Sequence, residues 1–275
     1  MISGTTKLVA HIGYPTEGFK APLIYNPWFE SRGIDAAVVP MGVKAGDLPS
    51  ALKAIFAMSN VSAALVTMPH KLASVELLDA SSDTVRASGA CNAILKRPDG
   101  TLFGEMFDGE GFVRGLRRKG FELEGISALV VGAGGVGSAI AAALAGCGVA
   151  SVKLCDLREG LAQQLLARLS RHFPAVAFRY GEADPSGFEL VVNATPLGMK
   201  PGDPLPFDVA KLDRATFVGE VVLEPGETPL LRAARERGCQ VQTGLEMLFE
   251  QIPAYLEFFG FGTTTPEELR AVSGL

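Results

Sequence analysis

The feature that most constrains the fold is a glycine-rich segment in the middle of the chain, Gly132-Ala-Gly134-Gly135-Val-Gly137. An apolar run typical of a buried strand precedes it, and a run of small apolar residues typical of a helix follows it. In such a unit the first glycine allows a tight turn, the second lets the backbone approach a pyrophosphate, and the third lets helix pack on strand. The segment therefore predicts a dinucleotide-binding turn of the Rossmann type. A purely structural glycine turn is the alternative.

Asp156 ends the next apolar strand, about 20 residues beyond the glycine turn, where such folds place an acidic residue. A carboxylate there accepts hydrogen bonds from an adenosine ribose and repels a 2′-phosphate. Arg158, two residues further on, offsets part of that repulsion. The sequence therefore predicts NAD as the cofactor, with NADP less favoured. The alternative is that Asp156 only caps the helix that follows it.

The composition excludes several other classes of protein. The chain has 275 residues, 48% of them hydrophobic, and a net charge of −5 with scattered Lys and Arg, so we expect no nucleic-acid partner. The four cysteines form no C-x-x-C pair and the three histidines lie far apart, so we expect neither a metal site nor a disulfide framework. The first residues lack a secretory signal pattern, and glycines interrupt the uncharged run of residues 125–152. We therefore expect a cytoplasmic protein without a membrane span.

The N-terminal part alternates between apolar runs and helical segments. Strands are predicted at residues 8–13, 36–43 and 62–68, helices at 23–32, 48–58, 71–78 and 83–88, and a hairpin at 92–106. This alternation predicts a first α/β domain, to which we assign residues 1–108.

The pattern changes near residues 108–120, where a new series of strands and helices begins. A strand, turn and helix are predicted at residues 127–148, further strands at 151–156, 177–181, 189–195, 216–222 and 240–244, and helices at 111–119, 159–172 and 246–259. Strands that alternate with helices imply a parallel sheet. We therefore expect an α/β fold of two domains, with a Rossmann domain at residues 109–243. Residues 244–275 form C-terminal helices, the longer of which can fold back over the first domain.

Two residues carry side chains suited to proton transfer. Lys71 follows the end of a predicted strand, and Asp108 lies at the domain junction. Oxidation of an alcohol needs a group that takes the hydroxyl proton, and a lysine oriented by an aspartate can do so. From spacing alone, a solvated lysine and an ordinary Asp108-Gly109 turn are the simpler interpretation. The polar turn of residues 193–199 follows a strand, where such sheets hold ligands, although it can also be an ordinary loop.

Together these motifs resemble the shikimate dehydrogenase family, in order and over nearly the whole chain. The family pattern Asn-Val-Thr-x-Pro-His-Lys is similar to residues 65–71, Gly-Ala-x-Asn to residues 89–92, and Gly-x-Asn-Thr-Asp-Gly to residues 104–109. The glycine turn and residues 193–199 match as well. Residues 225–231 and 244–251 are similar to the closing motifs of the family.

The resemblance implies an N-terminal substrate domain that faces the Rossmann domain, with the last helices returning to the first domain. It implies a catalytic dyad of Lys71 and Asp108, and substrate contacts from Thr67, Asn92 and Gln251. It also implies a set of residues that hold the cofactor: Gly132, Gly134, Gly135, Val136, Gly137, Asp156, Asn193, Thr195, Pro196, Leu197, Val221, Gly244 and Met247.

Several positions depart from the family pattern. The family reads Ser-x-Ser-Pro, whose two hydroxyls bind the substrate carboxylate, where this chain has Phe19-Lys-Ala21-Pro22. Other polar residues of the pattern are replaced by Leu65, by Met106-Phe107 and by Leu223. Members that use NADP tend to read Asn-Arg-Thr where this chain has Asp156-Leu157-Arg158, which again favours NAD. The substrate site is thus altered, whereas the dyad and the cofactor site are kept.

We therefore expect an NAD-dependent oxidoreductase that reversibly oxidises a ring hydroxyl of shikimate, quinate or a related cyclic polyol carboxylate. Two alternatives stay open. One is an NAD-binding sensor or regulatory protein with little turnover, and the other is a dehydrogenase of an amino-substituted shikimate relative. The expected partner is a small-molecule substrate, and the sequence leaves open whether the chain is a monomer or a homodimer.

Overall fold

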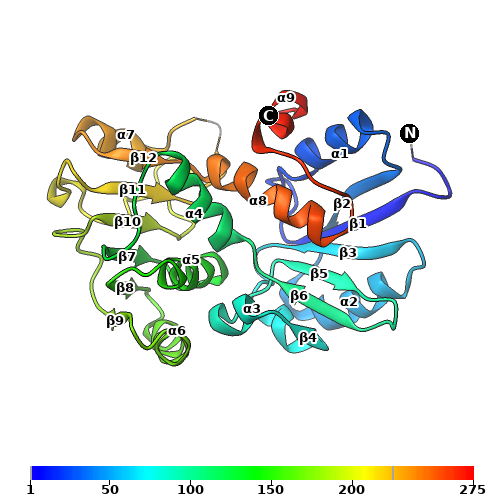
Figure 1. Ribbon diagram of the computed structural model, residues 1–275, viewed down its shortest axis with the longest axis horizontal. Helices are drawn as coiled ribbons and strands as arrows, with labels where there is room; N and C mark the ends of the chain where they lie inside the picture. The colour runs from blue at the N-terminus through cyan, green and yellow to red at the C-terminus, as the bar shows by residue number, and fades with distance from the viewer. Residues whose placement is uncertain (1, 225) are drawn as a thin grey trace. The chain divides into compact units, whose positions relative to one another are not determined.

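The computed structural model describes residues 2–224 and 226–275, and the chain divides into two compact units. The first unit contains Met1–Arg86, Ala90–Phe107 and Ile252–Leu275, and the second contains Ala87–Gly89 and Asp108–Gln251. Each unit has a six-stranded sheet, and Figure 1 labels the strands. The expected α/β class is therefore confirmed. Pro225, the first residue of one of the closing motifs, lies outside the described residues.

The sheet of the first unit is mixed, with the strand order β2-β1-β3-β5-β6-β4. The strands β1, β2 and β3 are parallel, β5 and β6 form an antiparallel hairpin beside β3, and β4 pairs in parallel with β6. The strands are β1 (Lys7–Gly13), β2 (Ala36–Gly42), β3 (Val61–Val66), β4 (Ala80–Ser81), β5 (Ala93–Lys96) and β6 (Leu102–Glu105). The predicted hairpin is thus present.

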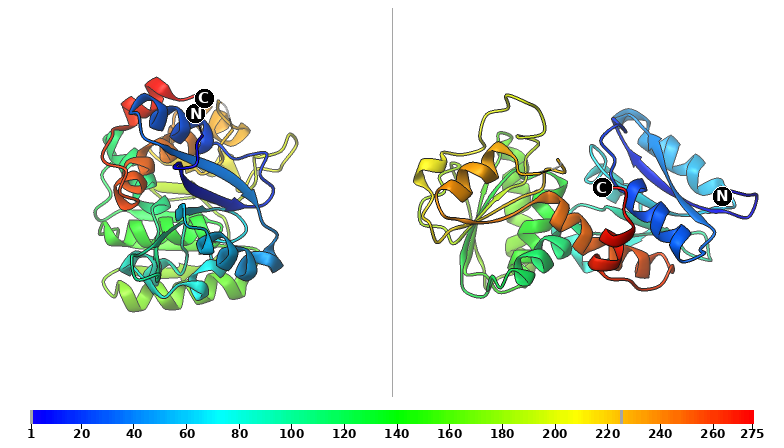
Figure 2. Two further views of the ribbon diagram at one scale, coloured as in Figure 1. Left: turned by 90° about the vertical axis from the view of Figure 1, so that its right-hand side faces the viewer. Right: turned by 90° about the horizontal axis from the view of Figure 1, so that it is seen from above.

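Two helices cover this sheet. The helix α1 (Pro22–Ser31) connects β1 to β2, and α2 (Leu48–Ala57) connects β2 to β3 in the opposite direction across the sheet. Because parallel crossovers are right-handed, the two helices lie on opposite faces, as the right-hand view in Figure 2 shows. The helix α1 turns Ile24, Tyr25, Trp28 and Phe29 into the core at the i, i+4 spacing of a helix.

The segment after His70 differs from the prediction. Residues 71–78 were expected to form an α-helix, but the structure has only the 3-10 helix η2 (Ala73–Leu77). The chain must become extended at Leu78, because the N–H of Asp79 donates to Leu102 O at 3.0 Å and β4 starts at Ala80. The other short elements of this part are η1 (Ala45–Asp47) and α3 (Asp83–Ser88).

The sheet of the second unit is entirely parallel, in the order β12-β11-β10-β7-β8-β9. The strands are β7 (Ser127–Val131), β8 (Ser151–Cys155), β9 (Ala177–Tyr180), β10 (Leu190–Asn193), β11 (Phe217–Glu220) and β12 (Gln240–Gln242). The helices of this unit are α4 (Asp108–Arg118), α5 (Gly135–Gly146), α6 (Glu159–His172) and α7 (Pro229–Glu236), with the 3-10 helix η3 (Val209–Lys211). This is the predicted Rossmann-like sheet.

Alternate residues of the central strand β7 enter two separate cores. Ala128 and Val130 of β7 belong to the core formed with α4, α5 and α6. Leu129 and Val131 belong to the core formed with α7. Both faces of the sheet are therefore buried, as parallel sheets require.

The order of the strands reverses between β7 and β10, since β7 leads through α5 to β8 whereas β10 leads through η3 to β11 on the other side. In open parallel sheets, ligands bind at the carboxyl ends of the strands at such a point. The glycine turn that follows β7 and the polar turn that follows β10 lie at this point.

The helix α8 (Gly244–Phe258) has a capping box at its start. The N–H of Thr243 donates to Glu246 Oε2 at 2.8 Å, and the N–H of Glu246 donates back to Thr243 Oγ1 at 3.2 Å. Its first half belongs to the second unit, where Lys119 Nζ lies 2.6 Å from Glu246 Oε1. Its last residues belong to the first unit, where Tyr255 packs on Phe107 with ring centroids 4.7 Å apart. The last helix, α9 (Pro266–Val272), lies beside α1, and Trp28 Nε1 donates to Thr264 Oγ1 at 3.0 Å.

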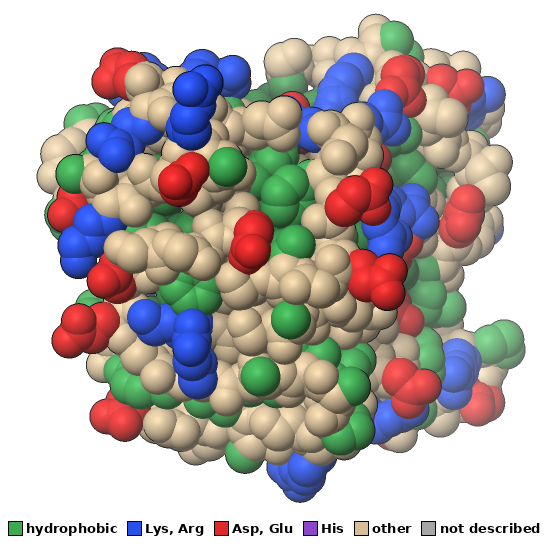
Figure 3. All heavy atoms as spheres, turned by 60° about the vertical axis from the view of Figure 1, so that its left-hand side comes forward, with side chains coloured by type: hydrophobic (Ala, Val, Ile, Leu, Met, Phe, Trp, Pro, Cys, Tyr) green, Lys and Arg blue, Asp and Glu red, His purple; other side chains and the backbone are tan. Residues whose placement is uncertain are grey.

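Three further observations concern the length of the helices, possible metal sites and the charges on the surface. None of the described helices is long and apolar enough to cross a membrane, and residues 2–224 and 226–275 contain no cluster of three or more His, Cys, Asp or Glu that suits a metal ion. Acidic and basic side chains are interspersed on the face that Figure 3 shows.

Candidate functional site

The glycine turn has the geometry of a phosphate-binding turn. Gly132 adopts φ +104°, which favours glycine, and its N–H donates to Cys155 O at 2.7 Å. A Cβ at Gly137 would overlap the carbonyl oxygen of Gly132, so only glycine lets the helix pack this closely on the turn. Gly134 is the extended residue that precedes α5, and Gly135 and Val136 open that helix. The first N–H groups of α5 therefore point out of the helix at the carboxyl end of β7.

Asp156 lies directly beside this turn. Its Oδ2 accepts the N–H of Ala133 at 2.7 Å, and its Oδ1 accepts the N–H of Arg158 at 2.8 Å. The Arg158 side chain contacts the same carboxylate, with Nε at 3.2 Å from Oδ1. The Asp156 side chain is only 8% exposed, whereas Arg158 is 69% exposed and its guanidinium lies over Gly134.

The ionisation of Asp156 follows from these contacts. Burial alone would raise the pKa of this carboxyl, but hydrogen bonds from Arg158 and from the Ala133 N–H hold it below its ordinary value. Leu157, between the two charged residues, is fully exposed and presents apolar surface next to the carboxylate.

The polar turn after β10 is held by its own side chains. Asn193 Oδ1 accepts the N–H of Thr195 at 3.1 Å and its hydroxyl at 2.6 Å. Asn193 Nδ2 donates to Leu197 O at 3.0 Å, and the N–H of Leu197 donates to Thr195 Oγ1 at 3.1 Å. Pro196 lies inside this closed loop. A Cβ at Gly132 would come within 2.8 Å of Ala194 O, so the loop lies directly against the glycine turn.

The three remaining predicted cofactor residues lie beyond the end of β11 and in α8. The N–H of Val221 donates to Asn193 O at 3.2 Å. A Cβ at Gly244 would overlap Val222 O, so α8 starts in close contact with the chain after β11. Met247 is buried in the core with α4, α5 and α6, so its side chain serves packing in this structure.

The structure thus brings the glycine turn, Asp156 and the loop of residues 193–197 together at one edge of the parallel sheet. Sequence reasoning missed Glu220, the buried last residue of β11. Burial raises the pKa of Glu220 to about 7, and hydrogen bonds from Thr228 and Asn193 act in the opposite direction. A single glutamate that ends an apolar strand is the signal by which it can be found.

Three predicted residues lie together in the first unit, at the end of β3 and the start of β5. The N–H of Thr67 donates to Ile12 O at 2.9 Å, and Lys71 accepts the N–H of Cys91 through its carbonyl oxygen at 2.8 Å. Asn92 is fully buried, with its Oδ1 accepting the N–H of Phe107 at 2.9 Å. Its Nδ2 has no hydrogen-bond partner in the described part of the chain, which leaves a donor for a ligand.

His11 belongs to the same region, and sequence reasoning missed it too. Its ring stacks on Phe19 with centroids 4.1 Å apart, and Gly13 approaches both Phe19 and Thr67. Burial lowers the pKa of His11 to about 3, and the positive charge of Lys71 contributes in the same direction. The imidazole is therefore neutral near pH 7. A histidine inside an apolar strand is the signal that marks it.

The other two predicted residues, Asp108 and Gln251, belong to the second unit. Asp108 is buried at the start of α4, three residues before the predicted start, and the adjacent Gly109 packs tightly on α5. Gln251 is buried against Gly111, and its Oε1 has no hydrogen-bond partner within the described ranges. Because Lys71 and Asp108 fall in different units, the pairing of the dyad stays a prediction.

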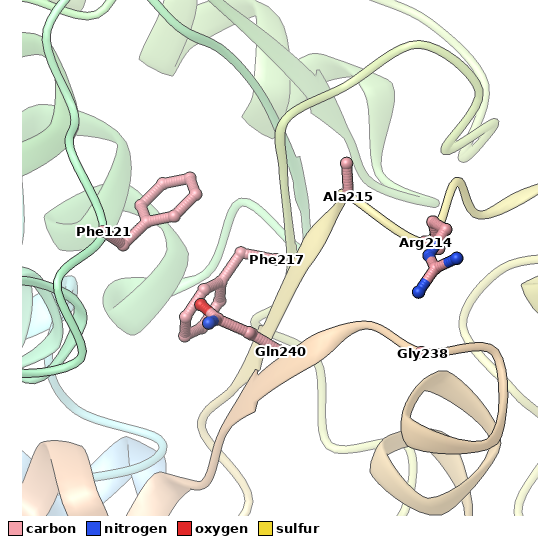
Figure 4. A pocket seen from close by; sticks show the side chains of 6 residues that line it. All are labelled: Phe121, Arg214, Ala215, Phe217, Gly238 and Gln240. Atoms are coloured by element: carbon pink, nitrogen blue, oxygen red, sulfur yellow. The ribbon is translucent and has the colours of Figure 1, made fainter.

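A separate hollow lies at the other end of the parallel strands. Figure 4 shows the residues that line it, which include Phe217 and Gln240, the first residues of β11 and β12. The glycine turn follows the last residue of β7, so this hollow is at the amino ends of the strands and apart from the site described above. Ligands of such sheets bind at the carboxyl ends, which favours the glycine-turn site.

Comparisons with known proteins cover nearly the whole chain. Residues 11–94 match the model of the shikimate dehydrogenase substrate binding domain. A shikimate dehydrogenase (NADP(+)) of Acidiphilium cryptum strain JF-5 is 37% identical over 276 residues, which is 99% of this chain and 98% of the relative.

Two solved structures are also similar. Shikimate 5-dehydrogenase from Listeria monocytogenes, in complex with shikimate and NAD, has a TM-score of 0.88 and 26% identity, and the match covers 98% of this chain and 97% of that chain. Quinate dehydrogenase from Corynebacterium glutamicum, in complex with NAD, has a TM-score of 0.86 and 29% identity, with 97% and 98% covered.

Proposed function

Since the chain belongs to the shikimate dehydrogenase family and is a shikimate/quinate dehydrogenase-type oxidoreductase with a nicotinamide dinucleotide cofactor, we propose that the cofactor is NAD. We further propose that the enzyme oxidises a ring hydroxyl of a cyclic polyol related to shikimate or quinate. The observation that carries the proposal is the assembly of the glycine turn, Asp156 and the loop of residues 193–197 at the switch point of the sheet.

The preference for NAD is argued from the carboxylate of Asp156. It is ionised and nearly buried beside the turn, so the hydroxyls of an adenosine ribose can donate to it. A 2′-phosphate at the same place meets a fixed negative charge, which Arg158 neutralises only in part. Leu157 offers apolar surface to an adenine ring. The Acidiphilium relative is named as NADP-dependent, so the residues at the end of β8 are where we expect this chain to differ from it.

Calorimetric titration of the protein with both oxidised cofactors tests this preference. We expect NAD to bind at least tenfold more tightly than NADP, which is about 1.4 kcal/mol. Equal affinities, or tighter binding of NADP, would contradict the role given to Asp156.

The chemistry is assigned to Lys71 and Asp108. The glycine turn, Asp156 and the loop of residues 193–197 would hold the cofactor, whose nicotinamide would supply the hydride acceptor. In this proposal Lys71 takes the proton of the reacting hydroxyl during oxidation and returns it to the ketone oxygen during reduction. Asp108 orients the lysine and balances the charge of the ammonium group that forms. Thr67, Asn92 and Gln251 are proposed to bind other polar groups of the substrate, and the unpartnered amide atoms of Asn92 and Gln251 suit that role.

The identity of the substrate is proposed from the first unit. Phe19 stacks on the neutral His11 where the family resemblance implies a serine, and Ala21 replaces the second serine. Hydrogen bonds to a charged group contribute about 1.5–3 kcal/mol each, so shikimate loses much of its affinity if its carboxylate meets this loop. We therefore propose a substrate whose carboxylate lies elsewhere or is absent.

Steady-state turnover of a panel of cyclic polyols with NAD tests this part. A kcat/KM for shikimate of about 10⁵ M⁻¹s⁻¹ or more, within the range of efficient enzymes, would contradict the altered specificity. Amino-substituted relatives belong in the panel. Cofactor binding without turnover of any member would favour the alternative of an NAD-binding sensor.

The assignment of roles along the chain is part of the proposal. Residues 1–108 would bind the substrate, residues 109–243 the cofactor, and residues 244–275 would return to the substrate domain. We also propose a cytoplasmic location, which agrees with the four free cysteine thiols.

A further inference from the structure

Glu220 is a buried residue that lies next to the proposed cofactor site. In the parallel register it lies beside Asn193 of β10, and Asn193 lies beside Val131, the residue before the glycine turn. Val218, two residues earlier on β11, enters the core with α7, so Glu220 points to the same face of the sheet. Its side chain is 1% exposed.

Two neutral side chains supply hydrogen bonds that lower the pKa of this carboxyl. One is the amide of Asn193, which also holds the loop through its bond to Leu197 O. The other is the hydroxyl of Thr228, which caps α7 by accepting the N–H of Leu231 at 3.3 Å. A Cβ at Gly198, the residue after the loop, would lie 3.8 Å from Thr228, so this residue is beside the threonine. Glu220 therefore connects the cofactor loop to the N-terminus of α7.

A buried carboxylate at this place destabilises the fold compared with an apolar residue. The Oε2 atom of Glu220 has no hydrogen-bond partner in the part of the chain that the structure describes. The groups that face it from β10 and α7 are neutral, and no charged side chain contributes to its raised pKa. A residue that costs stability and titrates near pH 7 beside a binding loop points to a functional role.

We propose that Glu220 is a positioning residue for the cofactor, which in its ionised form holds the loop of residues 193–197 against the glycine turn through Asn193 and Thr228. Hydrogen bonds to an ionised acceptor are roughly twice as strong as those to a neutral one. Protonation weakens both bonds, because a neutral carboxyl is a poorer acceptor than a carboxylate. Cofactor affinity is then linked to the proton on Glu220.

This inference depends on the turn and the loop holding the dinucleotide, but not on the choice between NAD and NADP. Binding of the reduced cofactor at pH 8, measured through nicotinamide fluorescence, tests the site itself. The change of affinity between pH 8 and pH 6 tests the role of Glu220. The proposed cofactor site and the proposed role of Glu220 can therefore be contradicted independently of each other.

The experiment measures the Kd of NADH from pH 6 to pH 8.5 for the wild type and for Glu220→Gln. For the wild type we expect the Kd to rise roughly threefold to tenfold between pH 8 and pH 6, the size of a weakened hydrogen bond. For Glu220→Gln we expect the weaker affinity at every pH and a flat profile. Glu236→Gln, at the exposed end of α7, removes the same charge and should keep the wild-type profile.

A second pair of variants keeps Glu220 in place. Thr228→Val removes a donor that stabilises the ionised form, so the midpoint of the pH profile should move to higher pH. Thr228→Ser keeps the hydroxyl and should leave the midpoint unchanged. A flat wild-type profile, a Glu220→Gln profile that still titrates, or an unmoved midpoint in Thr228→Val would each overturn the proposal.

Discussion

Lys71 carries the proposed proton transfer, and its charge already acts on the ring of His11 within the first unit. Lys71→Ala should lower kcat by roughly 10²–10⁴, the usual contribution of a general acid or base. The Kd of NAD should hardly change, because the glycine turn belongs to the other unit. Lys53→Ala, on the exposed side of α2, is the matched control and should keep both constants. Full turnover of Lys71→Ala with the true substrate would refute the mechanism.

The sequence predicts the position of some site residues in the fold but not of others. Asp156 follows a glycine turn at a spacing set by the length of one helix and one strand, so its position at the turn could be predicted. His11 and Glu220 lie at no fixed spacing from a recognisable motif in the sequence. Their environment is made by residues outside their own strands, Phe19 and Lys71 for His11, and Asn193 and Thr228 for Glu220. A polar residue in an apolar strand only indicates that such an environment must exist.

At the scale of elements, the strand, turn and helix that run from β7 to α5 depend on one close contact. A Cβ at Gly137 overlaps the carbonyl oxygen of Gly132, which is backbone and cannot move aside as a side chain would. Gly137→Ala should therefore shift α5 away from the turn and weaken NAD binding by at least tenfold, about 1.4 kcal/mol.

The matched control for that variant is Gly160→Ala at the start of α6. Gly160 is exposed, and a Cβ there meets nothing within 4 Å. Alanine favours a helix by about 1 kcal/mol over glycine, so this variant should keep its affinity and unfold at the same or a higher temperature. Calorimetric titration and thermal unfolding of both variants check the pair. Unchanged affinity in Gly137→Ala would contradict the role of the turn.

Helices and strands with a clear periodic pattern of apolar residues were predicted. Short helices that are marked only by the capping residues at their start were not. Apart from β4, which was not predicted, the strands of both sheets agree with the sequence to within a few residues, and so do the helices α1, α2, α5 and α6. The short helix α7 was missed, and α9 was predicted only as one of the C-terminal helices within residues 244–275, without bounds. Each starts with a capping threonine followed by proline, Thr228-Pro229 and Thr265-Pro266. Their start signals were present, but seven or eight residues give too few turns for a clear period.

For the whole molecule, the two units should respond to pH in opposite ways. His11 has a folded pKa of about 3 against an ordinary value of 6.5, so its contribution is present above pH 6.5 and is lost as the pH falls. Glu220 has a folded pKa of about 7 against 4.5, so its contribution is present below pH 4.5 and is lost as the pH rises through 7. The Glu220 difference corresponds to at most about 3 kcal/mol.

Calorimetric unfolding from pH 4.5 to pH 8.5 checks this expectation. Relative to the wild type, Glu220→Gln should gain stability as the pH rises from 5 to 8, and His11→Gln should gain stability as the pH falls below 6.5. If the curves of stability against pH are parallel for the wild type and both variants, the pKa of neither group is shifted by folding, and the expectation is wrong.

The contact between Asp156 and Arg158 has an evolutionary consequence. The guanidinium that lies over the turn at Gly134 is now bound to the carboxylate, and it is the group best placed to meet a 2′-phosphate if that carboxylate disappears. Exchange of Asp156 for asparagine would remove the repulsion and release the arginine in a single step. We therefore expect this one substitution to move the proposed preference from NAD toward NADP. The ratio of NAD affinity to NADP affinity, measured in Asp156→Asn and in the wild type, tests this expectation. An equal ratio in the two proteins would contradict it.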